Sequence, residues 1–301
     1  MHIYITGGTG FIGSHVVKEL SKGGHRITVL ARNTDKTPGL RSLPGVDIKK
    51  FDLTDYSKLK TMTKKMDALV LVALGWGDTG PDMIKNETLP EISLIDIAVK
   101  KGAKKIIFTS STAAAGPIKS TTDEQARRNP TDFYGATKGS VELFMSAYSN
   151  YNKSVAFNVI RPGYTFGWPA VTGGAMEPDT RFRDLCKKAK KGERLEFTMH
   201  DGTQFLWAGD LAKVYASVLE SDCKNEIFYG LSRNFITWEQ IGKWAFKYAS
   251  TKPKFKLRDL GWSDNPPLYA VDKIEKHFGL AFNSTETVKE HVRYLIENLD
   301  S

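Results

Sequence analysis

Four glycines stand within seven residues near the start of the chain, in the stretch MHIYITGGTGFIGSH, directly after a short apolar run. Glycine accepts positive φ and lets other atoms come close to the backbone. Ile3, Tyr4 and Ile5 read as a buried strand, and apolar residues recur at helical spacing from Phe11 onward. The glycines therefore occupy a turn between a strand and the N-terminus of a helix. The exposed N–H groups of that N-terminus can bind the pyrophosphate of a dinucleotide; the alternative is a tight turn without a ligand.

Two features of the surrounding sequence favour the nucleotide-binding interpretation. The glycines follow the first strand-like run of the chain, as a dinucleotide-binding turn does. A second strand-like run, residues 27–30, comes after Gly23 and Gly24 and closes a unit of roughly 30 residues. We therefore predict a dinucleotide-binding domain at the N-terminus.

Composition limits the class of protein. A length of 301 residues suits a dinucleotide domain with an added lobe. No run approaches the ~18 apolar residues of a membrane span, and no basic-then-apolar leader opens the chain. Cys186 and Cys223 lack the spacing of a metal site and indicate a reducing compartment. We expect a cytoplasmic protein with no membrane association and no metal site.

The net charge of +9, from 43 basic and 34 acidic residues, favours acidic ligands. Phosphates of a cofactor or a substrate would benefit as much as nucleic acid would. The densest basic cluster, residues 187–194, has no aromatic residues interleaved as a base-stacking surface requires. We therefore do not expect nucleic acid as a partner.

Strand-like and helix-like segments alternate in the first half of the chain, which predicts a parallel sheet covered on both faces. We predict an α/β fold with a Rossmann-type doubly wound parallel sheet in residues 1–163. A smaller C-terminal α/β lobe that binds substrate follows in residues 164–301, where Gly, Pro and Trp become frequent, and some of its segments, such as helix 210–220, are expected to return to the first domain. The predicted strands are 2–6, 26–31, 46–51, 68–74, 104–109 and 154–161, and the predicted helices are about 11–22, 55–65, 83–101 and 133–150.

A second motif, FYGATKGS, places Tyr134 and Lys138 four residues apart, on one face of a helix. An ammonium group near a phenol favours the phenolate, and such a tyrosine can exchange a proton with a substrate oxygen. The cluster Ser110, Ser111 and Thr112 at the end of a predicted strand supplies hydroxyls that can hold the same oxygen. A Tyr/Lys pair alone is common among surface neighbours.

Taken together, GGTGFIG, the Ser/Thr cluster and YGATK resemble the extended short-chain dehydrogenase/reductases, and within them the NAD-dependent epimerase/dehydratase group. The resemblance covers nearly the whole chain. Further matching pieces are FDLTD, IKNETL, IRPGYTFG, GDLAKVY and AVDKIEKHFGL.

The resemblance implies roles for individual residues. Tyr134 matches the acid/base tyrosine, and Lys138 the lysine that favours its phenolate and holds the nicotinamide ribose. Ser111 best matches the hydroxyl that orients the substrate, with Ser110 and Thr112 as close competitors. Asp52 would accept from the adenine amino group, or alternatively cap the next helix. The other implied cofactor contacts are Gly7, Gly10, Phe11, Ile12, Gly13, Leu53, Ala73 and Pro162.

The end of the second predicted strand, TVLARN, bears on the choice of cofactor. NAD-binding domains usually carry an acidic residue there for the ribose hydroxyls, and here that position is Ala31, followed by Arg32. A guanidinium group suits a 2′-phosphate, although Arg32 could instead be a solvated loop residue. We favour NADP(H), with NAD(H) as the alternative.

Departures from the family pattern limit the substrate. Thr112 and Ala113 stand where similar 4,6-dehydratases place Asp-Glu, so dehydration is not expected. Thr203 and Gln204 stand where the sugar-nucleotide enzymes commonly have Arg-Asp, the arginine of which reaches the diphosphate. We predict oxidation and reduction at a secondary alcohol or ketone carbon of a sugar nucleotide, as a 4-epimerase or a 4-ketoreductase. The alternative is NADPH-dependent reduction of a non-nucleotide carbonyl compound.

Three further expectations concern partners. The predicted substrate contacts are Trp76, Thr112, Tyr164, Arg181 and Arg258. A homodimer is expected through helices 83–101 and 133–150, as the resemblance implies. A non-catalytic protein that senses NADP or binds RNA is a third reading, which the intact Ser/Tyr/Lys set disfavours because a sensor needs no acid/base tyrosine.

Overall fold

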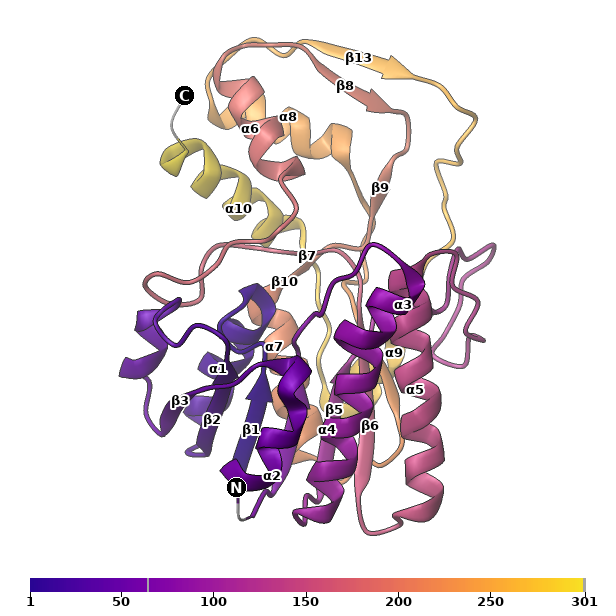
Figure 1. Ribbon diagram of the computed structural model, residues 1–301. Helices are drawn as coiled ribbons and strands as arrows, with labels where there is room; N and C mark the ends of the chain where they lie inside the picture. Colours follow the sequence, from indigo (N-terminus) through magenta and orange to yellow (C-terminus); the bar gives the residue numbers. More distant parts are fainter. Residues whose placement is uncertain (64, 300–301) are drawn as a thin grey trace.

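The computed structural model describes residues 1–63 and 65–299, which form a seven-stranded parallel sheet with a second lobe above it (Figure 1). Every pairing within this sheet is parallel. This confirms the predicted Rossmann-type α/β fold. In spatial order, the strands are β11 (Ile227–Gly230), β6 (Ala156–Pro162), β5 (Lys105–Thr109), β4 (Ala68–Leu71), β1 (His2–Thr6), β2 (Arg26–Ala31) and β3 (Val46–Lys50).

The strand order changes direction between β1 and β4. The chain builds outward from β1 through β2 to β3, and then starts again on the other side with β4. In open sheets of this kind, ligands bind beyond the carboxyl ends of the strands at such a switch point. The fold therefore places a binding site above β1 and β4.

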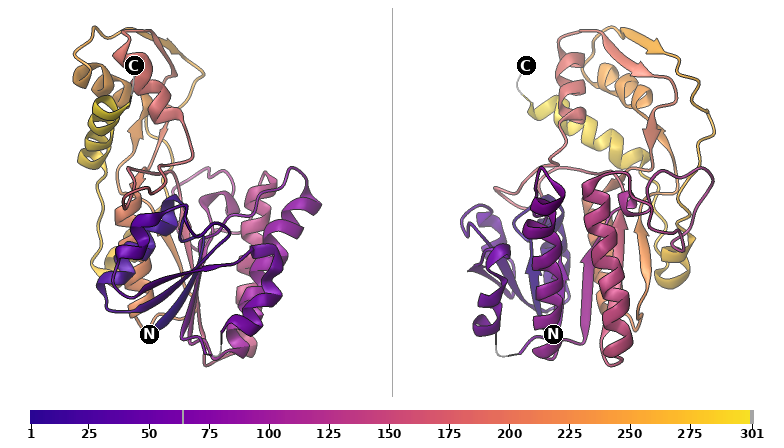
Figure 2. Two further views of the ribbon diagram at one scale, coloured as in Figure 1. Left: turned by 60° about the vertical axis from the view of Figure 1, so that its left-hand side comes forward. Right: turned by 45° about the vertical axis from the view of Figure 1, so that its right-hand side comes forward.

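Helices cover both faces of the sheet (Figure 2). Side chains alternate along β1, so that Ile3 and Ile5 belong to the core on one face and Tyr4 to the core on the other. The first face packs against α1 (Phe11–Lys22), α7 (Ala208–Glu220) and α9 (Asp272–Phe278). The second packs against α2 (Leu59–Met62), α4 (Leu89–Lys100) and α5 (Phe133–Tyr151).

Segments from the second half of the chain complete this first domain. Strand β11 pairs with β6, and the α7 residues Leu211, Val214 and Val218 are buried with the α1 residues Val16 and Val17 in one core. Helix 210–220 thus lies where the prediction put it. The division of function at residue 163 stays a prediction.

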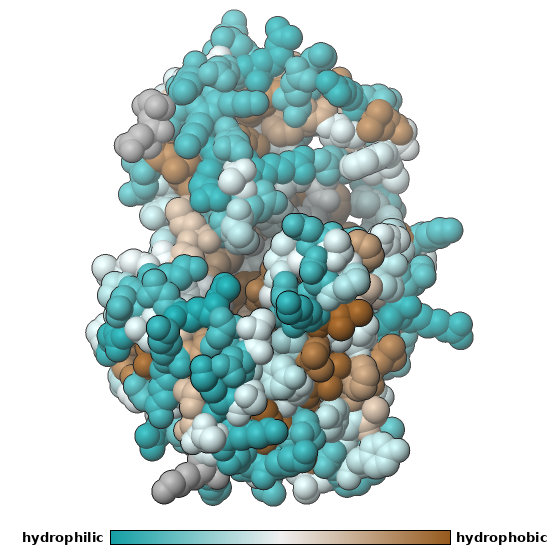
Figure 3. Space-filling model, viewed as in Figure 1, coloured by the Kyte–Doolittle hydropathy of each residue, from teal (hydrophilic) through white to brown (hydrophobic). Residues whose placement is uncertain are grey.

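The upper lobe has a core of its own, built from Phe166, Phe182, Phe205, Trp238 and Leu295. Its helices are α6 (Arg181–Lys190), α8 (Trp238–Tyr248) and α10 (Thr285–Asn298). Its strand pairs are β7 (Thr165–Phe166) with β10 (Leu206–Trp207), β8 (Leu195–Thr198) with β13 (Phe255–Arg258), and β9 (Gly202–Thr203) with β12 (Ile236–Thr237). A hollow runs between the lobe and the sheet domain (Figure 3).

Two predicted helices are less regular than expected. Residues 55–65 contain the 3₁₀ turn η2 (Leu53–Lys58) and the short α2. Residues 83–101 contain the end of α3 (Gly80–Met83), a π-helical turn, η3 (Ile84–Thr88), and then α4. Pro90 explains the π turn, because it has no N–H to donate to the Asn86 carbonyl one turn earlier. Two other short turns are η1 (Pro38–Ser42) and η4 (Thr112–Ala114).

Within the described part of the chain, no helix has both the length and the apolar character needed to cross a membrane.

Candidate functional site

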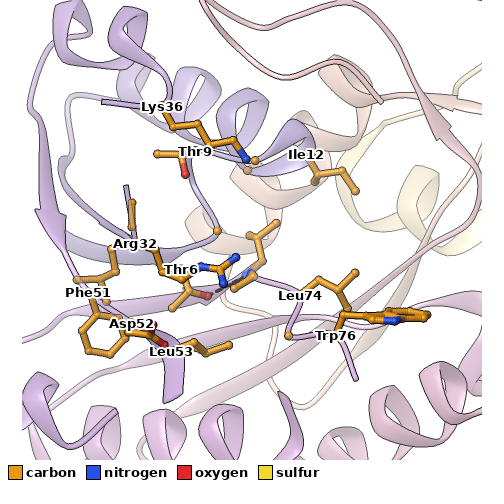
Figure 4. Close-up of a pocket in the computed structure, with 18 of the residues that line it drawn as sticks. Thr6, Thr9, Ile12, Arg32, Lys36, Phe51, Asp52, Leu53, Leu74 and Trp76 are labelled. Atoms are coloured by element: carbon orange, nitrogen blue, oxygen red, sulfur yellow. Dashed lines mark hydrogen bonds between the residues drawn. The ribbon is translucent and has the colours of Figure 1, made fainter. Parts of the chain in front are cut away.

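A cavity of about 740 Å³ lies at the carboxyl ends of β1, β2 and β4, at the switch point of the sheet (Figure 4). Three predicted cofactor residues, Tyr134, Lys138 and Pro162, are absent from its walls. Its lining includes the other nine, Gly7, Gly10, Phe11, Ile12, Gly13, Arg32, Asp52, Leu53 and Ala73.

The glycine turn leaves a surface on which a phosphate can sit. Gly7 has a φ of +69°, and a Cβ on Gly13 would lie only 2.1 Å from the Gly7 carbonyl oxygen. Gly10 caps α1 without any side-chain hydrogen bond to the first turn. The N–H groups at the start of α1 therefore face the cavity uncovered, which fits the pyrophosphate of a dinucleotide.

Two cations line the cavity beyond the end of β2. Arg32 and Lys36 are exposed, and both side chains extend into the cavity (Figure 4). No acidic residue of the described chain lines this part of the cavity apart from Asp52. The sequence reading missed Lys36, although it lies four residues after Arg32 in the same basic loop.

Asp52 carries a structural role as well as lining the cavity. Its Oδ1 accepts from the Thr54 backbone N–H at 2.9 Å and from the Thr54 hydroxyl at 2.7 Å. These two hydrogen bonds lower the pKa of Asp52, and the Arg32 charge adds to the effect. The capping role weighed in the sequence reading is thus present in the structure.

Trp76 lies at the opposite end of the cavity from Arg32 and Asp52 (Figure 4). Its side chain is 61% exposed. Asn86 donates its amide to the Trp76 carbonyl at 2.8 Å and so anchors the glycine-rich loop 75–80. Asn86 therefore positions the loop that carries Trp76.

The three adjacent hydroxyls after β5 differ in their surroundings. Ser110 is buried and donates to Glu142 Oε1 at 2.5 Å, and Arg161 neutralises that carboxylate. Ser111 is half-buried, and its oxygen accepts only the Ala113 N–H, at 3.1 Å, among the described residues. The Ser110 hydroxyl is therefore already hydrogen-bonded inside the protein. This geometry favours Ser111 as the hydroxyl that binds a substrate oxygen.

The first turn of α5, which carries Tyr134, packs on η4, the short turn that follows Ser111. Asp132 caps the helix by accepting the Gly135 N–H at 2.6 Å. A Cβ on Gly135 would lie 2.4 Å from the Ala113 carbonyl oxygen, so only glycine lets this turn pack so closely on η4. Tyr134, which is half-buried, precedes Gly135 in this turn.

Lys138, one turn further along α5, has a partner that the sequence reading missed. Its Nζ lies 2.5 Å from Glu87 Oε1 and 5.7 Å from the centre of the Tyr134 ring. Glu87 lies in the π turn η3, and Glu91 follows it in α4; both are fully buried. Apart from the ion pair, neither carboxyl group has a hydrogen-bond partner among the described residues.

The buried side chains of Glu87, Glu91 and Lys138 influence one another's pKa values. Burial raises the pKa of Glu87, which the Lys138 ammonium opposes, and raises the pKa of Glu91 to about 8. Burial is the largest single influence on the pKa of Lys138 and lowers it, but the Glu87, Tyr134 and Glu91 side chains together outweigh burial and raise that pKa. Lys138 is therefore charged and paired. No group of three or more His, Cys, Asp or Glu side chains is placed to hold a metal ion within residues 1–63 and 65–299.

Three residues predicted to contact substrate do not line either of the two large cavities of the described chain. The Tyr164 ring packs edge-to-face on the Phe205 ring against the lobe core, with 4.9 Å between the two ring centres. Arg181 pairs with Asp201 at 2.5 Å, and Arg258 pairs with Glu196 at 3.1 Å. Their side chains thus contact other residues of the lobe, and their contact with substrate stays a prediction.

Known proteins resemble this chain in sequence and in fold. The family model of the NAD dependent epimerase/dehydratase family matches residues 3–229. A UDP-glucose 4-epimerase from Neisseria meningitidis serogroup C is 30% identical over 159 residues, covering 48% of this chain and 47% of that protein. The chain thus matches about half of that relative's length.

Two other proteins resemble it over most of its length. The NAD-dependent epimerase/dehydratase terH of Aspergillus terreus is 26% identical over 310 residues, covering 90% of this chain and 86% of that protein. The crystal structure of a UDP-glucuronic acid 4-epimerase from Bacillus cereus, in complex with UDP-glucuronic acid and NAD, has a TM-score of 0.79 at 19% identity and covers 99% of each chain. At that identity the likeness concerns the fold.

Proposed function

The chain belongs to the NAD-dependent epimerase/dehydratase family, and on that premise we propose that it oxidises and reduces a secondary alcohol or ketone carbon with a nicotinamide dinucleotide. The observation that carries the proposal is the packing of the α5 N-terminus. This turn carries Tyr134 and packs Gly135 against Ala113, two residues after Ser111, which supports the pairing of Tyr134 with Ser111. It also lies beside the loop of the cofactor cavity, since a Cβ on Gly80 would be 3.6 Å from the Phe133 ring.

Each part of the site has a separate role in the proposed reaction. The uncovered N–H groups of α1 bind the pyrophosphate, and a bound nicotinamide supplies or accepts a hydride. Ser111 donates a hydrogen bond that orients the substrate oxygen. Tyr134 gives that oxygen a proton during reduction and takes one during oxidation. Lys138, held by Glu87, stabilises charge that develops on the Tyr134 oxygen.

NADP(H) is the cofactor that the cavity supports best. Arg32 and Lys36 extend into the cavity beyond β2, where a 2′-phosphate would need positive charge. The buried Ala31 stands where NAD-binding domains usually carry an acidic residue. NAD(H) is the alternative, and the bound NAD of the Bacillus cereus structure supports it.

Two substrate classes are compatible with this chemistry. A sugar nucleotide is supported by the names of the relatives, with epimerisation if the keto form turns within the site and net oxidation or reduction if it leaves. A non-nucleotide carbonyl compound is supported by the ion pairs that engage Arg181 and Arg258. Either substrate needs the same Tyr134.

We also propose a homodimer. The outward sides of α4 and α5 carry large apolar residues, and apolar atoms gather over these helices (Figure 3). A second copy of the chain would cover them.

The replacement Tyr134→Phe tests the proposed function. It removes the proton donor but leaves the glycine turn and Arg32 intact. We expect turnover to fall by about 10² to 10⁴-fold, while the rise in melting temperature caused by NADPH stays as in the wild type. Full turnover in this variant would place the acid/base residue elsewhere.

A further inference from the structure

A second cavity, of about 420 Å³, lies between the lobe and the loops that follow β5. We call it the lobe cavity. Its walls come from both halves of the chain, with Ile118 on one side and Thr203, Phe235 and Trp262 on the other. Its volume falls within the range of about 300–1,000 Å³ that small-molecule sites occupy.

The lining of the lobe cavity contains no Lys, Arg, Asp or Glu from the described part of the chain, and the imidazole of His200 is its one basic side chain there. Two of its polar residues differ in what they can offer. Gln204 is 3% exposed; its amide group donates to the carbonyls of Ser232 (2.9 Å) and Tyr269 (3.0 Å), and its oxygen accepts the Tyr269 N–H at 2.8 Å. Gln204 is thus engaged within the protein, whereas Thr203 forms no side-chain hydrogen bond in residues 1–63 and 65–299.

The lobe cavity reaches the proposed reaction site through Tyr269. The backbone of Tyr269 pairs with Thr122, in the segment that follows η4. Burial raises the pKa of the Tyr269 hydroxyl, and the Thr112 side chain partly offsets this rise. Ile118, which also lines the lobe cavity, belongs to the same segment, so a ligand in this cavity contacts the chain that follows Ser111 and η4.

Three arginines of the lobe that could reach a diphosphate have other partners within the protein. Arg181 pairs with Asp201 and stacks on the Trp238 ring at 4.0 Å. Arg183 donates to the Glu177 and Asp179 carbonyls. Arg258 pairs with Glu196. Phosphates moved into a cavity without counter-charges would lose hydration that nothing in the cavity replaces.

The walls of the lobe cavity present aromatic and aliphatic side chains rather than charged ones. Trp262 is 50% exposed on the loop after β13, at the rim of the lobe cavity, and Phe235, Pro266 and Pro267 complete this wall. A flat ring can stack on such surfaces without losing strong hydration. The lining therefore matches a neutral cyclic compound.

We propose that the lobe cavity holds the ring system of an uncharged ketone or secondary alcohol, so that the substrate of this chain carries no diphosphate. This inference rests on the proposed function and selects between its two substrate classes. Reduction would consume one NADPH and one proton for each ketone and give the secondary alcohol and NADP⁺.

The test uses the whole chain with saturating NADPH. The neutral probes are 1-tetralone and 4-chromanone, followed by loss of NADPH absorbance, and the charged probes are UDP-glucose and UDP-galactose with NADP⁺ or NAD⁺, followed by chromatographic separation of the epimers. We expect the ketones to be reduced, with a KM that does not change between low and high NaCl, because a neutral ligand is not screened.

Variants at the rim locate the ligand. Trp262→Ala should raise the ketone KM about tenfold, whereas Trp262→Phe keeps a ring and should stay close to the wild type. Thr203→Arg adds a charge to the wall and should also weaken ketone binding. None of these three replacements should alter the melting-temperature shift with NADPH, because Trp262 and Thr203 lie outside the cofactor cavity.

Two results would overturn the inference, and they differ in what they say about the proposed function. If UDP-sugars are epimerised by the wild type but not by Tyr134→Phe, and the ketones are inert, the function stands and the neutral substrate is wrong. If no probe of either class is converted or raises the melting temperature, both proposals fail.

Discussion

Glu91 carries a carboxyl group that is fully buried and lacks a hydrogen-bond partner among the described residues. Burial raises its pKa to about 8 from the ordinary glutamate value of 4.5, despite the opposing charge of Lys138. The folded protein therefore keeps a proton that the unfolded chain loses as the pH rises above 4.5. This contribution to stability is complete below pH 4.5 and is lost as the pH approaches 8.

The replacement Glu91→Gln tests this linkage. Glutamine cannot ionise, so the loss of stability between pH 6.5 and 8 should become smaller by up to about 2 kcal/mol. Urea unfolding at both pH values measures the difference. Glu290→Gln, an exposed change on α10, should keep the wild-type slope. Equal slopes in all three proteins would show that Glu91 is ionised in the folded state at neutral pH.

The position of Arg32 in the cavity wall leads to a prediction about the preference for NADPH over NADH. Arg32→Asp replaces a cation at the cavity wall by a group that suits ribose hydroxyls, so the ratio of kcat/KM for NADPH over NADH should fall by about 100-fold. Arg41→Ala serves as the control, because Arg41 pairs with Asp35 and does not line the cavity. A wild type that prefers NADH would contradict this use of Arg32.

Some residues of the candidate site could be predicted from sequence and others could not. Local motifs sufficed for the glycine turn and for the Tyr134/Lys138 pair, because both depend on short spacing within one element. The hydrogen bond from Ser110 to Glu142 joins residues 32 positions apart, so no local motif indicates it. The pairing of Lys138 with Glu87 likewise depends on how two helices pack, which no local pattern contains.

At the scale of elements, the start of α1 depends on a close backbone approach. Gly13→Ala would put a Cβ 2.1 Å from the Gly7 carbonyl oxygen and force the turn away from its position. We expect a loss of roughly 1–3 kcal/mol in stability and no melting-temperature shift with NADPH at concentrations that saturate the wild type.

A matched glycine provides the control for this change. A Cβ on Gly139, inside α5, would meet nothing closer than 3.4 Å. Gly139→Ala should therefore be neutral or stabilising by up to about 1 kcal/mol and should leave NADPH binding intact. Normal NADPH binding by Gly13→Ala would mean that the dinucleotide does not use this turn.

Most elements of the sheet domain could be predicted because their apolar runs are long and regular. Strand β11 was missed: it has only four residues and joins the sheet from a distant part of the chain. The π turn η3 was read as continuous helix, since its apolar spacing is helical and only Pro90 signals the change. That turn carries Glu87, so the irregular element is the one that brings a carboxylate to Lys138.

At the scale of the molecule, the proposed site exists only where the two halves of the chain meet. The cofactor cavity belongs mainly to the sheet domain, yet Pro178 of the segment that leads into the lobe also lines it. The lobe cavity has walls from both parts. Sequence patterns indicated two parts, but the contacts between them depend on side chains distant in the chain.

The apolar surface over α4 and α5 leads to the last prediction. Leu89, Leu143 and Phe144 are 47%, 57% and 47% exposed on two adjacent helices of one face. Large exposed apolar patches on folded proteins commonly mark interfaces. Because the same helices carry Glu87's neighbour Glu91 and Lys138 on their inner sides, a dimer formed here would also brace the site from behind.

Light scattering should therefore give twice the chain mass of 33.6 kDa for the wild type. The double change Leu143→Glu and Phe144→Lys introduces charges that would be desolvated in the interface, so it should yield monomers. Leu260→Lys, an equally drastic change at an exposed residue of the lobe, should leave the dimer intact. A monomeric wild type, or a dimer that survives the double change, would show that another surface or none joins the subunits.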